Sequence, residues 1–295
     1  MGAPPNHVGI PYNGDCMFRT YWLGFFAVLG AGAGADVKIV EEIVAKVNGD
    51  IITRSELERG RMMAEFELKQ QGFRAFKVGW GPFGRHTGVL DEAIVRAARE
   101  AIGPDALLMV DAGGSDAFWK QGYKWALRTA EMLAEFDVTW FEEPLRPDAM
   151  QDYVLLRRRS KVPIAGGEVL TRRQSFQPWI EGGALDVVQP DVTKCGGISE
   201  ERRIAWMAQE HGVRFIPHGW NTAVGLAADL QLASAFADTD LVEYLTGSPY
   251  VDGLAAGGWH LDAEGMLPIP AAAGLGLELN ADALVRYTRG ERLLA

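Results

Sequence analysis

The feature that most limits the fold of this chain is a series of short apolar runs from about residue 72 onward, separated by stretches with apolar residues at helical spacing. This alternation predicts βα units with parallel strands, in either a closed α/β barrel or an open doubly wound sheet. The helical stretches include Asp91–Ala101, Tyr123–Ala134 and Glu200–Glu210. The strand-like runs are Ala75–Val78, Leu107–Val110, Val138–Phe141, Val162–Ala165, Leu185–Val188, Val213–Ile216 and Asp240–Val242.

A polar residue stands at the end of each run, and consecutive ones are about one βα unit apart. In a closed barrel the carboxyl ends of all strands meet at one mouth, where catalytic groups from several strands converge. An open sheet would spread the same groups along a line too long for one site. The pattern therefore favours the barrel, with these residues at its mouth: Lys77, Asp111, Glu142, Glu168, Asp191, His218 and Glu243.

Three carboxylates end consecutive runs, at Asp111, Glu142 and Glu168. Oxygen donors of this kind suit Mg²⁺, which prefers octahedral oxygen ligands and keeps positions for water and substrate. Zinc would favour histidine or cysteine ligands. The alternative is that these acids only form ion pairs, with Lys77, Arg146 or Lys194 as partners. As a consecutive trio in barrel register, they predict a magnesium site.

Asp191 and His218 end neighbouring runs and predict an acid–base pair. A carboxylate bonded to one imidazole nitrogen fixes the tautomer and makes the other nitrogen a better base. The alternative is an ordinary structural histidine. Glu243 ends the last run, where it is predicted to hydrogen-bond a substrate oxygen or to form a salt bridge at the rim.

Seven segments carry a family resemblance over about residues 72–290: FKVGWG, VDAGG, WFEEPL, IAGGE, VVQPD, IPHGW and LVEY, in this order. These motifs and the spacings between them resemble the enolase superfamily, in its mandelate racemase and muconate lactonizing enzyme-like branch. The resemblance implies a barrel with Mg²⁺ on Asp111, Glu142 and Glu168. It also implies that Asp191 and His218 are the base, that Glu243 is the electrophilic partner, and that the reaction removes the proton α to a carboxylate.

Two departures from the family pattern narrow the predicted reaction. Many relatives carry Lys-x-Lys on the strand of Lys77, whereas this chain has Gly79 at the second position. A racemase needs bases on both faces of the substrate, so a one-base elimination is favoured. We therefore predict an acid-sugar dehydratase, a lyase acting on a small-molecule carboxylate. An epimerase or cycloisomerase of the same superfamily is the alternative. Asp111-Ala112-Gly113 also replaces the commoner Asp-Ala-Asn, which removes a polar side chain near the metal.

The first 71 residues do not show the alternation of apolar runs and helical stretches that is seen from residue 72 onward. A basic residue, a short apolar run and an Ala-Gly-Ala ending within 17–35 are typical of a secretory signal peptide. A dinucleotide-binding turn over Gly30–Ala35 is a rival interpretation, but no suitable helix and acidic strand end follow it. The segment IVAKVNGDIITRSELE, within 17–71, resembles the start of parvulin-type periplasmic chaperones. Its Asn-Gly-Asp sequence predicts a turn after a strand.

In the enolase superfamily a capping domain and a first barrel strand precede the lysine-bearing strand, and neither is recognisable in this chain. Ile51–Thr53 could serve as a substitute first strand, although nothing in the sequence demands it. We therefore predict three parts: a leader-like and chaperone-like segment at 1–71, a barrel lacking its first strand at 72–249, and a segment at 250–295 that returns toward the missing cap. A non-catalytic fusion fragment is the alternative of another class, and the uncovered apolar surface predicts self-association into a homo-oligomer.

The overall charge limits the partners. A formal net charge of -10 and a pI of about 5.1 argue against nucleic acid or an anionic membrane as the main partner. Cys16 and Cys195 fit neither a disulfide framework nor a zinc site. The barrel's relatives are cytoplasmic, so the same location is predicted, although the segment at 17–35 argues for export.

Overall fold

The computed structural model describes residues 43–47, 50–53, 69, 71–80, 83–85, 87–113 and 122–288. The leader-like segment at 17–35 and nearly all of the chaperone-like helix lie outside these residues. Within the described part of the chain, no helix is both long and apolar enough to cross a membrane.

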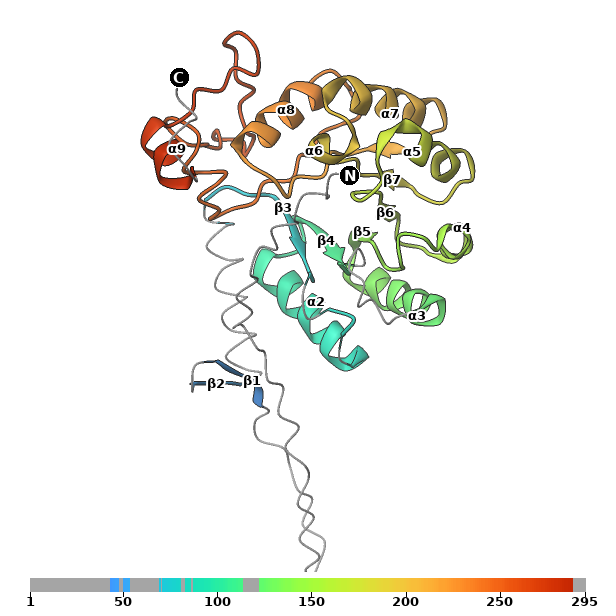
Figure 1. Ribbon diagram of the computed structural model, residues 1–295. Coiled ribbons are helices and arrows are strands. Elements are labelled where there is room, and N and C mark those ends of the chain that lie inside the picture. The colour runs from blue at the N-terminus through green and yellow to red at the C-terminus, as the bar shows by residue number, and fades with distance from the viewer. Residues whose placement is uncertain are drawn as a thin grey trace, which may run out of the picture. The chain divides into compact units, whose positions relative to one another are not determined.

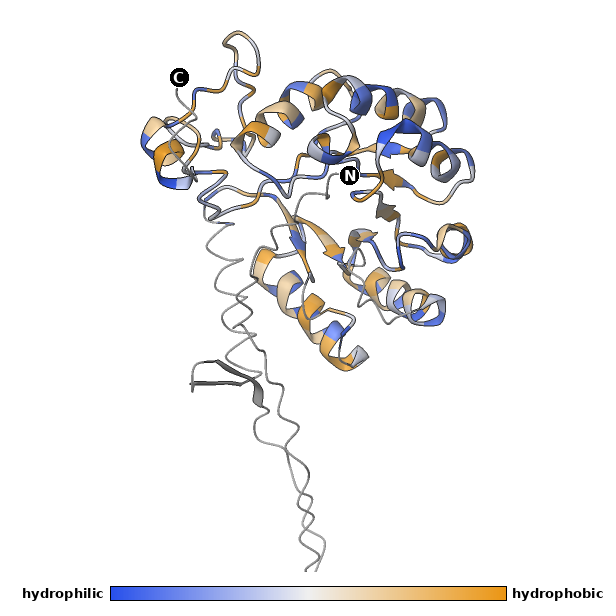
Figure 2. Ribbon diagram, in the orientation of Figure 1, coloured by the Kyte–Doolittle hydropathy of each residue, from blue (hydrophilic) through white to orange (hydrophobic). Residues whose placement is uncertain are grey.

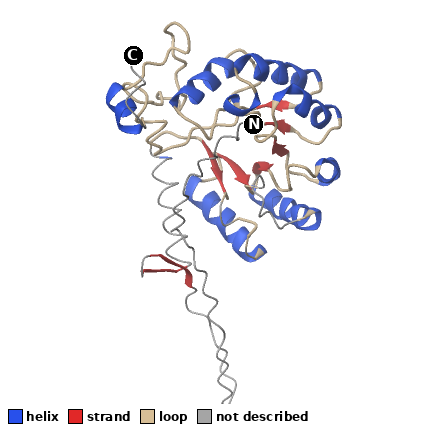
Figure 3. Ribbon diagram, viewed as in Figure 1, coloured by secondary structure: helices blue, strands red, loops and turns tan. Residues whose placement is uncertain are grey.

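The main sheet is parallel, and its strands follow one another in chain order without a reversal. A doubly wound sheet would reverse its order at a switch point, whereas a barrel keeps it. The predicted α/β barrel class is therefore confirmed, and Figures 1 and 3 show the strands along an arc with helices outside. The strands are β3 (Ala75–Val78), β4 (Leu107–Asp111), β5 (Val138–Glu142), β6 (Ile164–Gly166), β7 (Val187–Val188) and β8 (Arg214–Phe215).

The helices that follow the strands place an apolar side against the sheet. In α2 the buried positions recur three and four residues apart, and Thr87 caps the helix by accepting a hydrogen bond from the Leu90 N–H. Figure 2 shows mostly apolar strands and two-sided helices. The helices are α2 (Gly88–Ile102), α3 (Tyr123–Leu133), η1 (Ala134–Phe136), α4 (Met150–Arg159), α5 (Arg172–Glu181), α6 (Val192–Cys195), α7 (Ile198–Glu210), α8 (Ala223–Ala233) and α9 (Ala281–Tyr287).

A second cluster of buried side chains lies on one face of the sheet, and each successive apolar run supplies one member of it. Inward-facing side chains that pack together from successive strands are expected where a sheet curves toward a barrel. The segment after β8 joins this cluster through a single half-buried leucine. The members are Ala75, Met109, Trp140, Ala165, Val187, Ile216 and Leu241.

The prediction that Asp240–Val242 forms the seventh strand is wrong. These residues pair with no strand in the structure. β8 is only two residues long, so the ladder thins out before it can reach the next segment. Other contacts hold the segment instead. The Thr239 hydroxyl donates to the Phe215 carbonyl at 2.9 Å, and Arg214 pairs with Asp240.

Ile51–Thr53, the option considered for a substitute first strand, does not join the parallel sheet. Residues Ile51–Thr53 belong to β2 (Asp50–Thr53), which pairs antiparallel with β1 (Ile43–Val47) in a separate two-stranded sheet. The Asn-Gly-Asp sequence explains this outcome, because it favours a tight hairpin that joins adjacent strands. Among the described residues the parallel sheet therefore has six strands, beginning with β3.

The C-terminal segment packs on α8, a helix that is apolar on nearly all sides. Leu226 and Leu230 contact Val251, and Ala223 contacts Leu254 and Ala255. This packing covers a helix that would otherwise expose a large apolar surface.

Candidate active site

The strand registers bring the first predicted groups together at the carboxyl end of the sheet. Asp111 and Glu142 are directly paired neighbours on β4 and β5. Lys77, on β3, extends its ammonium to within 2.6 Å of Glu142 Oε1 and 3.4 Å of Asp111 Oδ2, and it also contacts Glu243. Burial disfavours the charged lysine, but the three carboxylates outweigh that effect and hold its pKa well above the usual value.

Glu142 is buried, and both of its oxygen atoms have partners. Lys77 binds one oxygen, while Trp140 Nε1 and Gln189 Nε2 donate to the other at 3.0 and 2.9 Å. Burial is the largest influence and raises the pKa of Glu142 to about 7. Gln189 also donates to Glu243 at 3.4 Å, so it links two acids. Gln189 was missed in the sequence, although it stands in the strand-end segment VVQPD.

The chain passes Asp111 so closely that only glycine fits at position 79. Gly79 has φ +116°, and a Cβ built there would lie 2.4 Å from the Asp111 carbonyl oxygen. The backbone N–H of Gly113 donates to Asp111 Oδ1 at 2.6 Å. Burial raises the pKa of Asp111 despite Lys77 and this hydrogen bond. The chain therefore has glycine where the second lysine would stand, and a side chain at this position would clash with the backbone of Asp111.

His218 and Asp191 form the predicted pair. His218 Nδ1 lies 2.8 Å from Asp191 Oδ2, and both side chains are buried. Burial alone would raise the pKa of Asp191, but hydrogen bonds from His218 and Thr193 lower it to about 2. Burial would likewise lower the pKa of His218, but Asp191, Glu168 and Glu243 together raise it to about 10.

Glu168 joins the dyad to the other carboxylates. Its Oε2 lies 2.9 Å from His218 Nε2, and its Oε1 lies 3.7 Å from Lys194 Nζ. Burial is the largest single influence on Glu168, but His218, Lys194 and Lys77 together outweigh it and lower the pKa. Glu243 lies between the two halves of the site, because it contacts Lys77, accepts a 2.8 Å hydrogen bond from the Gly219 N–H, and approaches His218 Nε2 to 3.9 Å.

Glu143 is a buried acid that the sequence did not single out, although it is the second residue of the Glu142-Glu143-Pro144 doublet. Its backbone adopts φ +42°, an uncommon value for a residue with a side chain, and its Oε2 has no hydrogen-bond partner. Burial raises its pKa well above the usual value, and Glu168 and Asp111 add to that effect.

The donor set has the chemistry of a hard-cation site. Asp111, Glu142 and Glu168 supply carboxylate oxygens, as Mg²⁺ prefers. Burial raises the pKa values of Asp111, Glu142 and Glu143, neighbouring carboxylates add to that effect, and one Glu143 oxygen has no hydrogen-bond partner, so a bound cation would stabilise the ionised forms of these acids. Among the described residues, however, no three acids, histidines or cysteines converge on one ligand position. The three carboxylates fit the ion by type and number of donors, whereas their positions in the structure do not yet enclose one ligand position.

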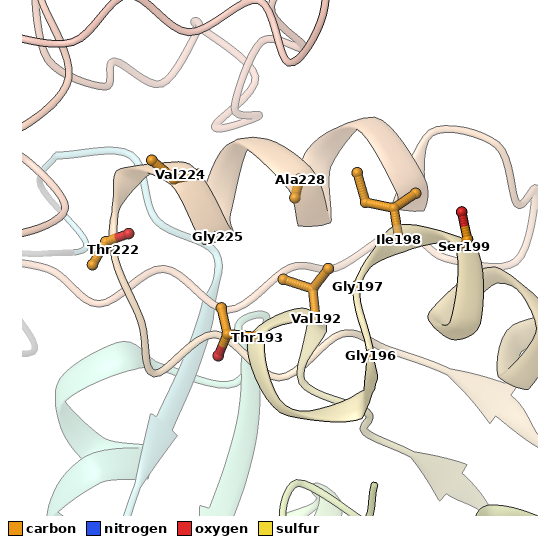
Figure 4. Close-up of a pocket in the computed structure, with 10 residues that line it drawn as sticks. All are labelled: Val192, Thr193, Gly196, Gly197, Ile198, Ser199, Thr222, Val224, Gly225 and Ala228. Atoms are coloured by element: carbon orange, nitrogen blue, oxygen red, sulfur yellow. The ribbon is translucent and has the colours of Figure 1, made fainter. Parts of the chain in front are cut away.

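A hollow of about 440 Å³ lies on the flank of the barrel rather than at this site. Figure 4 shows it between the α6–α7 turn and the first turns of α8. Its lining is small or apolar and includes Val192, Gly196, Ile198, Thr222 and Ala228. None of the predicted site residues lines it, so it does not mark the reaction centre.

Comparison with known proteins identifies the family of most of the chain. The family model described as enolase C-terminal domain-like matches residues 61–283. A D-galactarolactone cycloisomerase from Agrobacterium fabrum is 36% identical over 231 residues, which is 75% of this chain and 58% of that protein. A D-xylonate dehydratase from Haloferax volcanii is 30% identical over 208 residues, 68% of this chain and 48% of that protein.

Two solved structures share the fold over most of the chain. The 3,6-anhydro-D-galactonate cycloisomerase from Zobellia galactanivorans is 31% identical with a TM-score of 0.68, covering 78% of this chain and 63% of that one. A mandelate racemase/muconate lactonizing enzyme-like protein from Rubrobacter xylanophilus is 28% identical with a TM-score of 0.69, covering 79% and 61%. The chain thus spans less than two thirds of the length of each of these relatives.

Proposed function

This chain belongs to the family of enolase C-terminal domain-like proteins, and on that premise we propose that it is a Mg²⁺-dependent acid-sugar dehydratase. The substrate would be a small carboxylate bearing a hydroxyl on the β-carbon. The reaction would remove the proton α to the carboxylate and expel that hydroxyl as water; where the α-carbon also bears a hydroxyl, as in aldonic and aldaric acids, the resulting enol becomes a 2-keto acid. One observation supports this most strongly: a buried His218–Asp191 pair adjoins the carboxylates at the mouth, while Gly79 leaves no room for a second base.

His218 is the proposed base. Asp191 bonds its Nδ1 and leaves Nε2 toward the mouth, where Glu168 and Glu243 lie. The same imidazole, once protonated, would return its proton to the departing hydroxyl group, so one residue serves both steps. Lys77 would place a positive charge near developing negative charge on the substrate, and Glu243 would hydrogen-bond a substrate oxygen.

Asp111, Glu142 and Glu168 are the proposed ligands of Mg²⁺. The ion would supply the positive charge that makes a very weakly acidic α-proton removable. Glu168 accepts a hydrogen bond from His218 and favours its protonated form. A bound cation would offset the charge of Glu168 and so favour the neutral imidazole that a base requires. The trio and the dyad are thus coupled through Glu168.

A cycloisomerase is the second candidate, because the 36% identity with the D-galactarolactone cycloisomerase extends over 75% of this chain. Both reactions begin with the same proton abstraction. Solvent deuterium incorporated into recovered substrate without keto-acid product would favour isomerisation, and keto-acid product from an acyclic acid would favour dehydration.

The test is a screen of the purified full chain against aldonic and aldaric acids with Mg²⁺, with keto-acid formation as the readout. His218→Asn should abolish turnover and leave Mg²⁺ binding intact. His211→Asn is the matched control, because His211 is exposed, lies outside the proposed site and has its ring bonded to the Met207 carbonyl. Activity that survives His218→Asn would refute the assigned base.

A non-catalytic fusion remains the alternative of another class, and amide hydrogen exchange distinguishes it from an enzyme. Protection across β3 to β8 and at Leu241–Glu243 would support a closed barrel able to catalyse. Rapid exchange at Ala75–Val78 and Leu241–Glu243, with no turnover, would support the fusion account.

The domain boundaries, the chaperone-like origin of 17–71, the homo-oligomer and the cytoplasmic location belong to the same proposal. The acid-sugar relatives support a small-molecule carboxylate as the partner. Sedimentation analysis would show the oligomeric state. Fractionation of cells expressing the chain would show whether the segment at 17–35 directs export.

A further inference from the structure

Gln189 is a buried polar side chain at the mouth to which the mechanism above gives no role. Along a strand, residues two apart lie on the same face. The residues two places beyond the members of the sheet's second cluster therefore form a further layer on that face, which we call the mouth layer. Gln189 belongs to it, because it follows β7 and stands two places beyond Val187. The members of the mouth layer are Lys77, Asp111, Glu142, Gly167, Gln189, His218 and Glu243.

The amide of Gln189 faces two acids of this layer. The side chain is fully buried, and its Nε2 lies 2.9 Å from Glu142 Oε2 and 3.4 Å from Glu243 Oε1. A primary amide carries two N–H donors, so one group can bind both acids. The opposite orientation would bring the amide oxygen against the same two carboxylates, with no proton between them. The contacts therefore fix which end of the amide faces the acids.

Glu142 uses its two oxygen atoms differently. Oε2 accepts hydrogen bonds from Gln189 and, at 3.0 Å, from Trp140 Nε1. Oε1 contacts the ammonium of Lys77 at 2.6 Å. The two uncharged donors come from β5 and from the residue after β7, so two separate elements restrain one oxygen. The other oxygen is left to a cation.

We propose that Gln189 is a positioning residue: together with the Trp140 indole it holds Glu142 Oε2, so that Oε1 is the oxygen offered to a cation. Gln189 acts through Glu142. An acid that is already oriented binds a metal more tightly, because less freedom is lost on binding. The effect on Mg²⁺ rests on the proposed function, whereas the orientation of Glu142 does not.

The first experiment tests the orientation by NMR, without Mg²⁺ or substrate. Gln189→Met keeps the length of the side chain and removes both N–H donors, so Glu142 becomes free to turn. The indole N–H resonance of Trp140, identified by its loss in Trp140→Phe, should then shift. Gln189→Asn keeps an amide but is one methylene too short to reach both acids, so it should give the same shift. This variant decides the matter if Gln189→Met does not fold.

Gln231→Met is the matched control. Gln231 is a half-buried glutamine on α8, and its Nε2 also lies near two acceptors, the Pro270 and Leu275 carbonyls, at 2.7 and 3.3 Å. The control variant loses comparable hydrogen bonds and some stability, but its Trp140 resonance should stay in place. If that resonance also stays in place when Gln189 is replaced, the proposal is overturned.

The second experiment is a calorimetric titration with Mg²⁺. The Gln189→Met and Gln189→Asn proteins should bind the ion roughly tenfold more weakly than the wild type, and Gln231→Met should bind it as the wild type does. Wild-type affinity in both Gln189 variants would show that Gln189 only fills space and would overturn the proposal. A wild-type chain that binds no Mg²⁺, with the Trp140 resonance shifted as expected, would contradict only the proposed function and would support the orientation of Glu142 by Gln189.

Discussion

Replacing Gly79 with alanine tests how tightly the chain packs where β3 reaches the mouth. Two effects add at this position. The residue has φ +116°, which L side chains rarely adopt, and the new Cβ would lie 2.4 Å from the Asp111 carbonyl oxygen. Real Cβ atoms essentially never come this close to backbone, so the backbone around Asp111 must move.

The cost can be worked from these two effects. Strained backbone costs about 1–3 kcal/mol, and overpacking against atoms that cannot rotate away costs about 1–3 kcal/mol. We expect Gly79→Ala to destabilise the chain by about 4 kcal/mol, which corresponds to a fall in Tm of roughly 8–16 °C. Because Asp111 is a proposed ligand, Mg²⁺ should also bind more weakly.

Two matched glycine variants separate the effects. Gly197→Ala keeps the unfavourable φ of +83° but meets no atom within 4 Å, so it should show the strain alone, about 1–3 kcal/mol. Gly88→Ala meets nothing within 4 Å in the first turn of α2 and should be neutral or stabilising by up to about 1 kcal/mol. Guanidinium unfolding and calorimetric titration with Mg²⁺ provide the two readouts. A Gly79→Ala protein as stable as Gly88→Ala would refute the reasoning.

Three further changes test the charges of the site. Lys77→Met removes the cation shared by Asp111, Glu142 and Glu243. The free energy of unfolding, measured with denaturant, should fall by about 3–5 kcal/mol without Mg²⁺ and by less with Mg²⁺. An equal fall in both buffers would contradict the metal assignment. Asp191→Asn removes a group whose depressed pKa of about 2 adds about 2 kcal/mol of stability above pH 4, a contribution lost as pH falls toward 2. An acid titration of both proteins should show that difference, and parallel curves would refute it. Glu168→Gln should weaken Mg²⁺ binding at least tenfold in a calorimetric titration, whereas Asp148→Asn, at an exposed surface pair, should not change it.

Local pattern was enough to predict most of the fold. The runs beginning at Ala75, Leu107 and Val138 start strands at those residues, because an apolar run bounded by turn residues is itself the local signal. The antiparallel pairing of β1 with β2 follows the same logic, since Asn-Gly-Asp is a local sequence signal for a hairpin. The predicted strand at Asp240–Val242 failed because a strand needs a neighbour to pair with, and β8 is too short to extend to it.

The site shows the same division. The position of a polar residue at the end of a strand is a property of sequence, and from it we predicted Lys77, Asp191 and His218 at the mouth. Contacts between distant residues are not such a property. Nothing in the local sequence indicates that Glu168 would bind His218, or that Gln189 would bridge two acids.

Burial decided the remaining features. Glu201 stands in a helix beside Glu200, and the two read alike in sequence, yet one is fully buried and the other forms ion pairs at the surface. Which of the two acids is removed from water depends on how the helix packs in the fold. The sequence by itself determined the order of βα units and which residues end the strands, because these depend on local periodicity. Only the tertiary structure decided which of those charges meet and which are removed from water, because electrostatic energies depend on distance and burial.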